Sequence, residues 1–387
     1  MKRRLKSFPM LNDIIVLSLI LSVSTLVNVN TVIPSYMGSL GAQAFIVGLA
    51  YTLMAFSRAV ARLISGFLRD VAGERIVLTI CLLLRMCAYI LLFLAKDVLN
   101  LVAGLALLAT AQGLENPALL SATAVVAGET ASTGAVFGLI LTLRMGPNIV
   151  SPVLSGWFAD SFGVRNIFIL GLVLTCFSLL FYTRVKTGFK LKYADPLGVK
   201  AVFRKDLLLL LLATFFLFIT VSSFIPILSY WIGEELGYSY LALGLVFSSR
   251  NLIALFSRVY SGQLSDRFGE LNMLMCVGLV RAVALLLLPF TKEIAAITLL
   301  VVLHGSLMAA PPRSAFIAKM FGKEDYGKAY GSVGLAQDLG SMVGPVLMGF
   351  IADHYGYTVA YMSMSGFLIA FIFTIGVLKR FSSTLNG

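Results

Sequence analysis

The sequence predicts an all-α membrane protein with twelve transmembrane helices, arranged as two six-helix bundles with pseudo-twofold symmetry and a 3+3 inverted repeat in each half. Three observations support this prediction. The composition is too apolar for a soluble fold, the apolar residues fall into runs of membrane-spanning length, and a short glycine–aspartate motif recurs along the chain.

The composition points to lipid as the solvent. Of the 387 residues, 59% are hydrophobic and 12% are charged, and the mean hydropathy is +0.95. A soluble domain carries about 25% charged residues, and surface-to-volume scaling limits the apolar surface that it can bury. Because a helix needs about 20 apolar residues to cross the hydrocarbon core, this length fits twelve spans with short loops. We therefore expect a multi-pass protein of the plasma membrane.

Charged and glycine-rich breaks divide the chain into its expected spans. The first span follows the basic residues 2–6, and its apolar run is too long for the hydrophobic region of a signal peptide. We expect an N-terminal six-helix bundle over 1–184, a basic cytoplasmic linker over 185–206 and a C-terminal six-helix bundle over 207–387. The expected spans are 11–36, 44–68, 76–95, 98–124, 134–158, 165–183, 207–232, 240–264, 272–291, 294–318, 327–351 and 358–378.

Basic residues are concentrated in alternate loops. With the N-terminus in the cytoplasm, the cytoplasmic segments hold most of the loop lysines and arginines, whereas the external loops hold Lys96, Arg165 and Lys292. This asymmetry is the positive-inside bias, so both termini are predicted to be cytoplasmic. The net charge of +12 then reflects membrane topology rather than nucleic-acid binding. The basic linker is expected to contact anionic lipid headgroups.

Several classes of function find no support in the sequence. The four cysteines lie in apolar runs, without a CxxC pair or a neighbouring histidine, so neither a disulfide framework nor a metal site is predicted. There is no P-loop, GxSxG or HExxH pattern. We therefore expect no enzyme activity, no cofactor and no self-contained ATP-driven pump.

The motif G-x-x-x-D-x-x-G occurs four times, each copy closing the second helix of a three-helix unit. The first and third copies are predicted to face the cytoplasm and the second and fourth the outside, which indicates an inverted repeat inside each of two parallel halves. A shift of 196 residues also superposes Arg62 on Arg258 and Arg85 on Arg281. The four copies are Gly66/Asp70/Gly73, Gly156/Asp160/Gly163, Gly262/Asp266/Gly269 and Gly349/Asp353/Gly356.

The first copy, with Arg75 after it, resembles the signature loop between helices 2 and 3 of the major facilitator superfamily, and the third is its closer copy in the second half. Through the repeat spacing, the resemblance covers essentially the whole chain. It implies a secondary transporter with rocker-switch alternating access, in which these loops latch the halves in the outward-facing state. A carboxylate there could bond the N–H groups of a facing helix N-terminus. The implied gating residues are Gly66, Asp70, Gly73, Arg75, Gly262, Asp266, Arg267 and Gly269.

Two departures from the family's drug/proton antiporters stand out. Those proteins often carry an arginine in helix 4, three residues before Gln-Gly, whereas here Ala109 precedes Gln112-Gly113. Their helix 5 often reads Gly-x-x-x-Gly-Pro, and this chain has Pro147-Asn-Ile-Val-Ser151-Pro152. The antiporter pattern is incomplete, which weakens the case for both proton coupling and export.

Charges inside the spans are candidates for function, because they are costly in lipid. Eight arginines lie there, against two carboxylates of equal depth, Glu115 and Asp338. A substrate binds once, so the two repeated arginine pairs named above are interpreted as architectural partners of loop carboxylates or helix-end carbonyls. The unduplicated charges are more informative. Glu115 and Arg144 lie at similar depth on neighbouring helices, so an ion pair between them is predicted.

Polar side chains follow three predicted helices at helical spacing. Gln112, Glu115 and Asn116 share a face of helix 4, Arg144, Asn148 and Ser151 share a face of helix 5, and a third stripe follows helix 1. The stripes predict a hydrated cavity in the first half, with interhelical hydrogen bonding as the alternative. In the second half, the mid-span residues include His304, which can titrate near neutral pH. The substrate and coupling candidates are Asn28, Arg58, Gln112, Glu115, Arg144, Asn148, Arg250, His304 and Asp338.

These observations predict a secondary active transporter of a small organic solute, bound between the halves. The excess of intramembrane arginine favours anionic or polar substrates, and Glu115 and Asp338 are the candidates for proton coupling. A monomer without a nucleic-acid partner is expected. The main alternative is a multidrug exporter of lipophilic compounds, which the aromatic-rich helix 7 favours. A non-transporting membrane receptor or scaffold is a more remote one.

Overall fold

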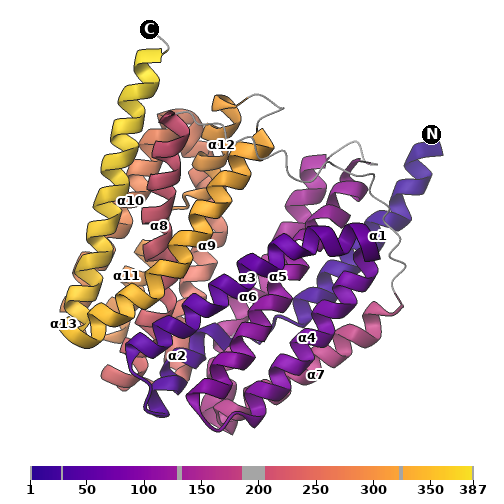
Figure 1. Ribbon diagram of the computed structural model, residues 1–387, viewed down its shortest axis with the longest axis horizontal. Helices are drawn as coiled ribbons and strands as arrows, with labels where there is room; N and C mark the ends of the chain where they lie inside the picture. The colour runs from indigo at the N-terminus through magenta and orange to yellow at the C-terminus, as the bar shows by residue number, and fades with distance from the viewer. Residues whose placement is uncertain (1, 28, 129–132, 185–204, 322–325, 386–387) are drawn as a thin grey trace. The chain divides into compact units, whose positions relative to one another are not determined.

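The computed structural model describes residues 2–27, 29–128, 133–184, 205–321 and 326–385, and throughout these residues the regular elements are helices (Figure 1). Contacts divide the chain into two compact units. Unit 1 comprises Met1–Tyr36, Leu53–Ala194 and Ser239–Gly244, and unit 2 comprises Met37–Thr52, Asp195–Tyr238 and Leu245–Gly387. Most of the predicted basic linker, residues 185–204, lies outside the described residues.

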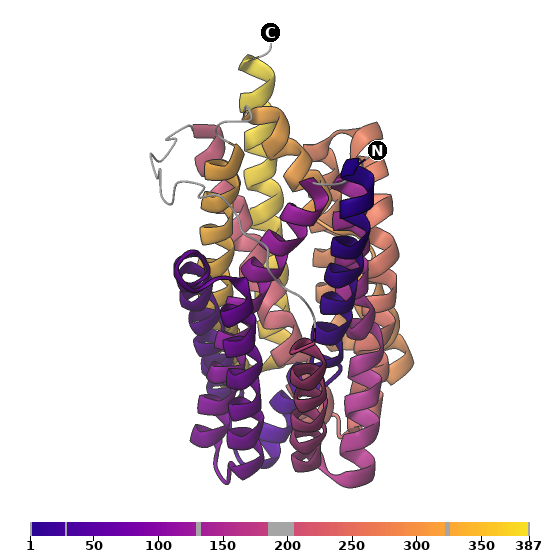
Figure 2. The same ribbon diagram turned by 90° about the vertical axis from the view of Figure 1, so that its right-hand side faces the viewer.

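Unit 1 is built around α4, which packs against both α5 and α7, while α1 (indigo in Figure 2) packs against α6. Aliphatic side chains of α1, α4, α5 and α6 form one buried core, in which Leu17, Leu21, Val77, Leu78 and Leu82 are fully buried. This apolar packing positions the polar groups described below. The helices of the first half are α1 (Lys2–Val23), α2 (Val29–Ser39), α3 (Ala44–Ala72), α4 (Glu74–Leu94), α5 (Val98–Gly128), α6 (Thr133–Phe162) and α7 (Val164–Tyr182), of which the end of α2 and the start of α3 belong to unit 2.

Unit 2 is organised by α13, which packs along α8 and α10. Helix α13 bends sharply at Gly356, where its ribbon turns from orange to yellow in Figure 1, and so forms two successive helical segments. The helices are α8 (Lys205–Tyr230), the π-helical turn η1 (Trp231–Glu235), α9 (Tyr240–Phe268), α10 (Glu270–Leu287), the 3-10 turn η2 (Leu288–Phe290), α11 (Ile294–Gly305), α12 (Ala310–Met320) and α13 (Tyr326–Leu385).

The described residues confirm a multi-pass membrane protein. They contain 9 helical segments that are long and apolar enough to cross a membrane. The longest, Ala329–Phe381, contains the bend at Gly356 and therefore holds two of the predicted spans. The two six-helix halves predicted from the sequence are consistent with this series of helices.

Two predicted spans are interrupted, which the hydropathy pattern did not predict. The span 11–36 divides into α1 and α2, and the span 294–318 divides into α11 and α12. The second break has a clear cause. Pro311 and Pro312 begin α12 and have no N–H to donate, so the carbonyls one turn earlier, at Leu307 and Met308, lose their helical partners.

The last glycine of each motif copy has the same backbone conformation. Gly73, Gly163, Gly269 and Gly356 have φ values of 82°, 85°, 85° and 84°. This left-handed region strains residues that carry a Cβ, so glycine is required for the turn into the next helix. The repeated motif is therefore a repeated turn in three dimensions, as its sequence predicted.

The aspartates of the second and fourth copies cap helix N-termini. Within unit 1, the Asp160 carboxylate accepts hydrogen bonds from the backbone N–H of Tyr240 (3.1 Å) and Leu241 (2.8 Å) at the start of α9. Within unit 2, Asp353 accepts from Ala44 (2.9 Å) and Phe45 (2.7 Å) at the start of α3. A carboxylate at this place satisfies unpaired N–H groups and complements the helix dipole.

Candidate functional site

Unit 1 contains a cavity of about 240 Å³ beside the break between α1 and α2. Its lining is mainly polar and comes from the break itself, from the start of α2 and from α3, α4, α5 and α6. The cavity therefore lies where the predicted polar stripes of helices 4 and 5 converge. The lining residues are Ser24, Thr25, Val27, Val29, Asn30, Arg58, Arg85, Tyr89, Leu108, Gln112, Glu115, Asn116, Arg144 and Asn148.

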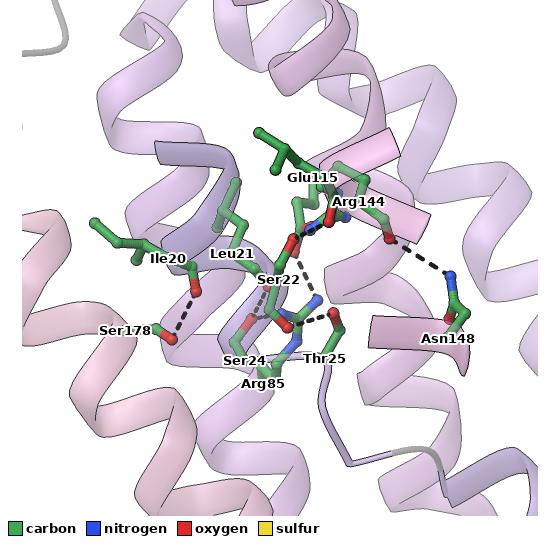
Figure 3. Close-up of polar contacts among 11 residues, drawn as sticks. Ile20, Leu21, Ser22, Ser24, Thr25, Arg85, Glu115, Arg144, Asn148 and Ser178 are labelled. Carbon is green, nitrogen blue, oxygen red and sulfur yellow. Dashed lines mark hydrogen bonds and ion pairs between the residues drawn. The ribbon is translucent and has the colours of Figure 1, made fainter. Parts of the chain in front are cut away.

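Glu115 is the centre of the polar cluster, as Figure 3 shows. Its Oε2 accepts a hydrogen bond of 2.6 Å from Nη2 of Arg85, and its Oε1 accepts one from Nη2 of Arg144. The other terminal nitrogen of Arg85 donates to the hydroxyl of Ser24. One carboxylate thus joins α4, α5 and α6, and through Arg85 the end of α1. The Glu115–Arg144 ion pair predicted from depth alone is confirmed.

Hydroxyl groups hold the broken end of the first span in place. Ser24 donates to the carbonyl of Leu21 (2.7 Å), and Thr25 donates to the carbonyl of Ser22 (2.9 Å). Such local bonds satisfy carbonyls that the interrupted helix leaves without partners. The hydroxyl of Ser22 donates in turn to the carbonyl of Leu143 (3.1 Å) on α6. These bonds fix the break against the residue that precedes Arg144.

The cavity lining carries an excess of positive charge. Three arginines line it, Arg58, Arg85 and Arg144, against the single carboxylate of Glu115. The side chains of Arg85 and Glu115 are 2% and 1% exposed, whereas that of Arg144 is 17% exposed. Nη1 of Arg144 makes no hydrogen bond within the described residues. Arg144 is therefore the member of the ion-paired cluster best placed to bind a solute in the cavity.

Five of the nine sequence candidates line this cavity. Asn28 lies outside the described residues, and Arg250, His304 and Asp338 belong to unit 2. The five are Arg58, Gln112, Glu115, Arg144 and Asn148.

The partner expected for Arg85, a loop carboxylate or a helix-end carbonyl, was wrong, because Arg85 binds Glu115 inside the cavity. Arg85 was assigned to architecture because it repeats as Arg281. The unrepeated Glu115 was the signal that could have shown that the two arginines have different partners.

In unit 2, the side chains of Arg250 and His304 both contact the aromatic ring of Phe224. His304 stacks on Phe224 with 4.0 Å between the ring centroids, and the guanidinium carbon of Arg250 is 5.4 Å from the Phe224 centroid. Arg281 donates to the carbonyl of Leu307 (3.2 Å). This is one of the two carbonyls that have no helical partner because of Pro311 and Pro312. The interpretation of Arg281 as a partner of a helix-end carbonyl is confirmed.

The predicted gating loops have the expected turn, and their latching role stays a prediction. The side chain of Asp70 lies outside the described residues, and Asp266 and Arg267 are exposed. Arg75 donates to the carbonyl of Thr183 (3.3 Å). Helix capping by a motif aspartate occurs at the second and fourth copies. The described part of the chain contains no group of His, Cys, Asp or Glu side chains suited to a metal ion.

Two repeats of helices, paired intramembrane charges and a polar cavity point to a transporter. A sequence profile of the Major Facilitator Superfamily matches residues 15–209 and again residues 210–384. The chain belongs to the major facilitator superfamily. The two matches cover the two halves in turn, in agreement with the repeat inferred from the glycine–aspartate motif.

Relatives of this superfamily member include proteins named for multidrug resistance. It is 27% identical over 357 residues to a multi-drug resistance efflux pump PmrA homolog of Lactococcus lactis subsp. lactis (strain IL1403). The alignment covers 87% of each chain. It is 26% identical over 359 residues to the multidrug resistance protein MdtG of Citrobacter koseri (strain ATCC BAA-895 / CDC 4225-83 / SGSC4696), with 87% of this chain and 86% of MdtG covered.

Solved structures show the same fold at low sequence identity. A mutant form of the nucleoside transporter NupG aligns with a TM-score of 0.80 and 11% identity, over 95% of this chain and 99% of NupG. A bacterial homolog of the human lysosomal transporter Spinster, in an inward-facing and unoccupied conformation, aligns with a TM-score of 0.73 and 12% identity, over 97% and 95% of the two chains. At these identities the likeness concerns the fold, and this superfamily member shares it.

Proposed function

We propose that this chain is a secondary active transporter that moves a small anionic or polar organic solute by alternating access, with a binding site in the unit 1 cavity. The observation that carries the proposal is the charge of the lining, where three arginines surround one carboxylate. Glu115 neutralises part of this charge through its two ion pairs. The positive charge that remains favours a solute that carries a negative charge or several hydrogen-bond acceptors.

The arrangement suggests a role for each cavity group. Arg144 would bind an acidic group of the solute, since it is the more exposed partner of Glu115. Gln112, Asn116 and Asn148 would supply hydrogen bonds that fix the orientation of the solute. Arg85 would hold Glu115 and the break after α1 in place rather than bind the solute itself.

Proton coupling is part of the proposal. Glu115 can bond both arginines as a carboxylate, and a protonated carboxyl would hold them less strongly, because it has lost its charge. Protonation would then release Arg144 toward a solute anion. Asp338 of unit 2 is the second coupling candidate. The expected orientation has both termini in the cytoplasm, and the expected working form is a monomer.

A ligand screen on the purified full chain in detergent tests the site. A ligand that binds the folded state raises the melting temperature by mass action. Small organic anions, sugars and nucleosides would be compared with lipophilic cations, each at two pH values, for the unmodified chain, Arg144→Gln and Arg62→Gln. Arg62 serves as the control, because it is an exposed arginine of α3 that does not line the cavity.

We expect the anions to stabilise the unmodified chain and Arg62→Gln, and Arg144→Gln to lose most of that stabilisation. An equal response of all three proteins would show that the anions bind elsewhere, and the proposed site would be wrong. A response to lipophilic cations alone would overturn the preference for anions.

Export of lipophilic compounds is a second candidate, favoured by the names of the drug-exporting relatives. The cavity restricts which compounds fit this function. Because its single carboxylate is already paired with two arginines, the charge of the cavity disfavours lipophilic cations and favours neutral or acidic compounds. Drug susceptibility of a sensitive host that expresses the chain separates the candidates. Resistance to cationic dyes that survives Glu115→Gln would favour a broad exporter with another binding site.

A further inference from the structure

Unit 2 contains a second group of basic side chains, at the break between α11 and α12. Arg281 and His304 are 5% and 1% exposed, and Arg250 lies between Phe224 and Gly305. Neither ring nitrogen of His304 has a hydrogen-bond partner within the described residues, and the same holds for Nε of Arg250 and Nε of Arg281. Several donors in a buried place therefore lack an acceptor.

The group of basic side chains is compact. A Cβ added at Gly305, the residue after His304, would lie 2.8 Å from Cγ of Arg250, so the Arg250 side chain packs directly on this part of α11. Arg281 binds the carbonyl of Leu307, three residues beyond His304. The three groups are close enough to interact electrostatically with one another. Arg250 on α9 and Arg281 on α10 thus lie beside the end of α11, which carries His304.

Two of these basic residues of unit 2, Arg281 and His304, correspond to residues of the unit 1 cavity. Gln112-Gly113 and His304-Gly305 are repeat equivalents, and a shift of the same length places Leu307 on Glu115. An arginine packs on the glycine in both places, because a Cβ at Gly113 would lie 2.5 Å from the carbonyl oxygen of Arg58 and one at Gly305 would lie 2.8 Å from Cγ of Arg250. The repeat counterparts of Arg85, Gln112 and Glu115 are Arg281, His304 and Leu307, whereas Arg250 stands at the position of Met54.

The difference that matters for charge between the two sets of residues is the acid, since Leu307 stands where unit 1 has Glu115. In unit 1 the arginine of α4 binds the Glu115 carboxylate, whereas in unit 2 its equivalent, Arg281, binds a backbone carbonyl. Among the described residues, no carboxylate pairs with Arg250 or Arg281. Buried charge without a counter-charge is strongly unfavourable in a membrane protein. An anion from solution could supply the negative charge that Glu115 supplies in unit 1.

We propose that Arg250, Arg281 and His304 form an anion-binding site at the α11–α12 break of unit 2, which accepts the carboxylate of a small organic acid or a small inorganic anion. The anion would occupy the electrostatic place of the missing glutamate. The guanidinium groups of Arg250 and Arg281 would give it charge-assisted hydrogen bonds, and the imidazole of His304 would donate a further one. The site is separate from the unit 1 cavity and does not depend on the proposed function of that cavity.

Histidine NMR can observe this site directly, because the chain has 2 histidines, and the other, His354, is exposed on α13. The full chain with isotope-labelled histidine would be titrated in lipid nanodiscs with sodium benzoate in one arm and sodium chloride in the other. A His354→Gln sample assigns the signals. We expect the His304 signal to shift saturably with benzoate while that of His354 does not move.

Two substitutions on the same helix test which arginine is responsible. Arg250→Gln should weaken binding about tenfold or more, since a charge-assisted hydrogen bond is lost. Arg258→Gln, an exposed position of α9, should leave the titration unchanged. Saturation by chloride as well as benzoate would identify a general anion site, and a response to benzoate alone would identify a carboxylate site. A His304 signal that ignores both anions, or that responds equally in Arg250→Gln, would overturn the proposal.

Leu307→Glu gives a test that does not depend on loss of binding through misfolding. This change places a carboxylate at the repeat equivalent of Glu115. We expect it to raise the melting temperature in anion-free buffer and to abolish the benzoate response of His304. A variant that folds, melts no higher and still binds benzoate like the unmodified chain would contradict the inference. Arg144→Gln in unit 1 should leave the His304 titration intact, which distinguishes failure of this proposal from failure of the proposed transport site.

Discussion

Replacement of Glu115 by glutamine should destabilise the protein more than any single change at an exposed ion pair. The carboxylate is 1% exposed and binds two arginines. At the 2.6 Å that separates Arg85 Nη2 from Oε2, one unit-charge pair gains about 6 kcal/mol at an effective dielectric constant of 20, before desolvation is counted. Removal of one partner of a buried pair costs about 3–5 kcal/mol. Since glutamine can still accept one hydrogen bond, we expect the lower end, about 3 kcal/mol.

Equilibrium unfolding in mixed detergent micelles, followed by helix content, measures this free energy. Glu270→Gln is the matched control, because Glu270 pairs with Lys319, whose side chain is 70% exposed. An ion pair of that kind contributes about 0–1 kcal/mol. The free energy of unfolding should therefore fall roughly three times as far in Glu115→Gln as in the control.

A double-mutant cycle with Arg85→Gln shows whether the loss arises from the ion pair. Residues joined in one ion-pair network couple by about 0.5–3 kcal/mol, so Arg85→Gln/Glu115→Gln should be less destabilised than the sum of the two single variants. Additive losses, or a Glu115→Gln variant as stable as Glu270→Gln, would refute the assignment of Glu115 as the centre of the unit 1 cluster.

Three further predictions concern the backbone features. Gly163→Ala should lower the free energy of unfolding by about 1–2 kcal/mol because its φ is 85°, whereas Gly138→Ala, in open space on α6, should be neutral or slightly stabilising; detergent unfolding of the two variants would show this difference, and equal losses would contradict it. Asp353→Ala should cost about 1 kcal/mol through loss of the α3 cap, with faster amide exchange at the start of α3, and unchanged exchange there would count against the cap. Pro311→Ala restores an N–H that can bond the carbonyl one turn earlier, so α11 and α12 should join and Arg281 should lose its acceptor. Amide exchange at residues 306–311 should then slow. Exchange as fast as in the unmodified chain would show that the proline does not cause the break.

Much of the fold follows from local properties of the chain. Apolar runs predict helices of membrane length because lipid requires every backbone group to be bonded within its own segment. The repeated motif predicted four equivalent turns, and Gly73, Gly163, Gly269 and Gly356 all have the positive φ that explains their glycine. Depth along two neighbouring helices was enough to predict the Glu115–Arg144 ion pair.

The candidate site could be predicted only in part. Helical spacing placed Gln112 and Asn148 on polar faces, and both line the cavity. Arg85 was missed because symmetry between the halves was taken to mean the same role in both. The break after α1 was missed because hydropathy averages over a window and does not register a local change from helical bonds to hydroxyl bonds.

The sequence by itself determined the membrane class, the superfamily, the repeat and the residues that carry charge into the bilayer. Only the tertiary structure decided how these charges are paired, because equivalent arginines meet different acceptors. Arg85 meets the Glu115 carboxylate, and Arg281 meets the Leu307 carbonyl in the break between α11 and α12. Partners of this kind come from segments tens of residues apart, so their pairing depends on how the helices pack. The periodicity of side chains along one helix does not determine that packing.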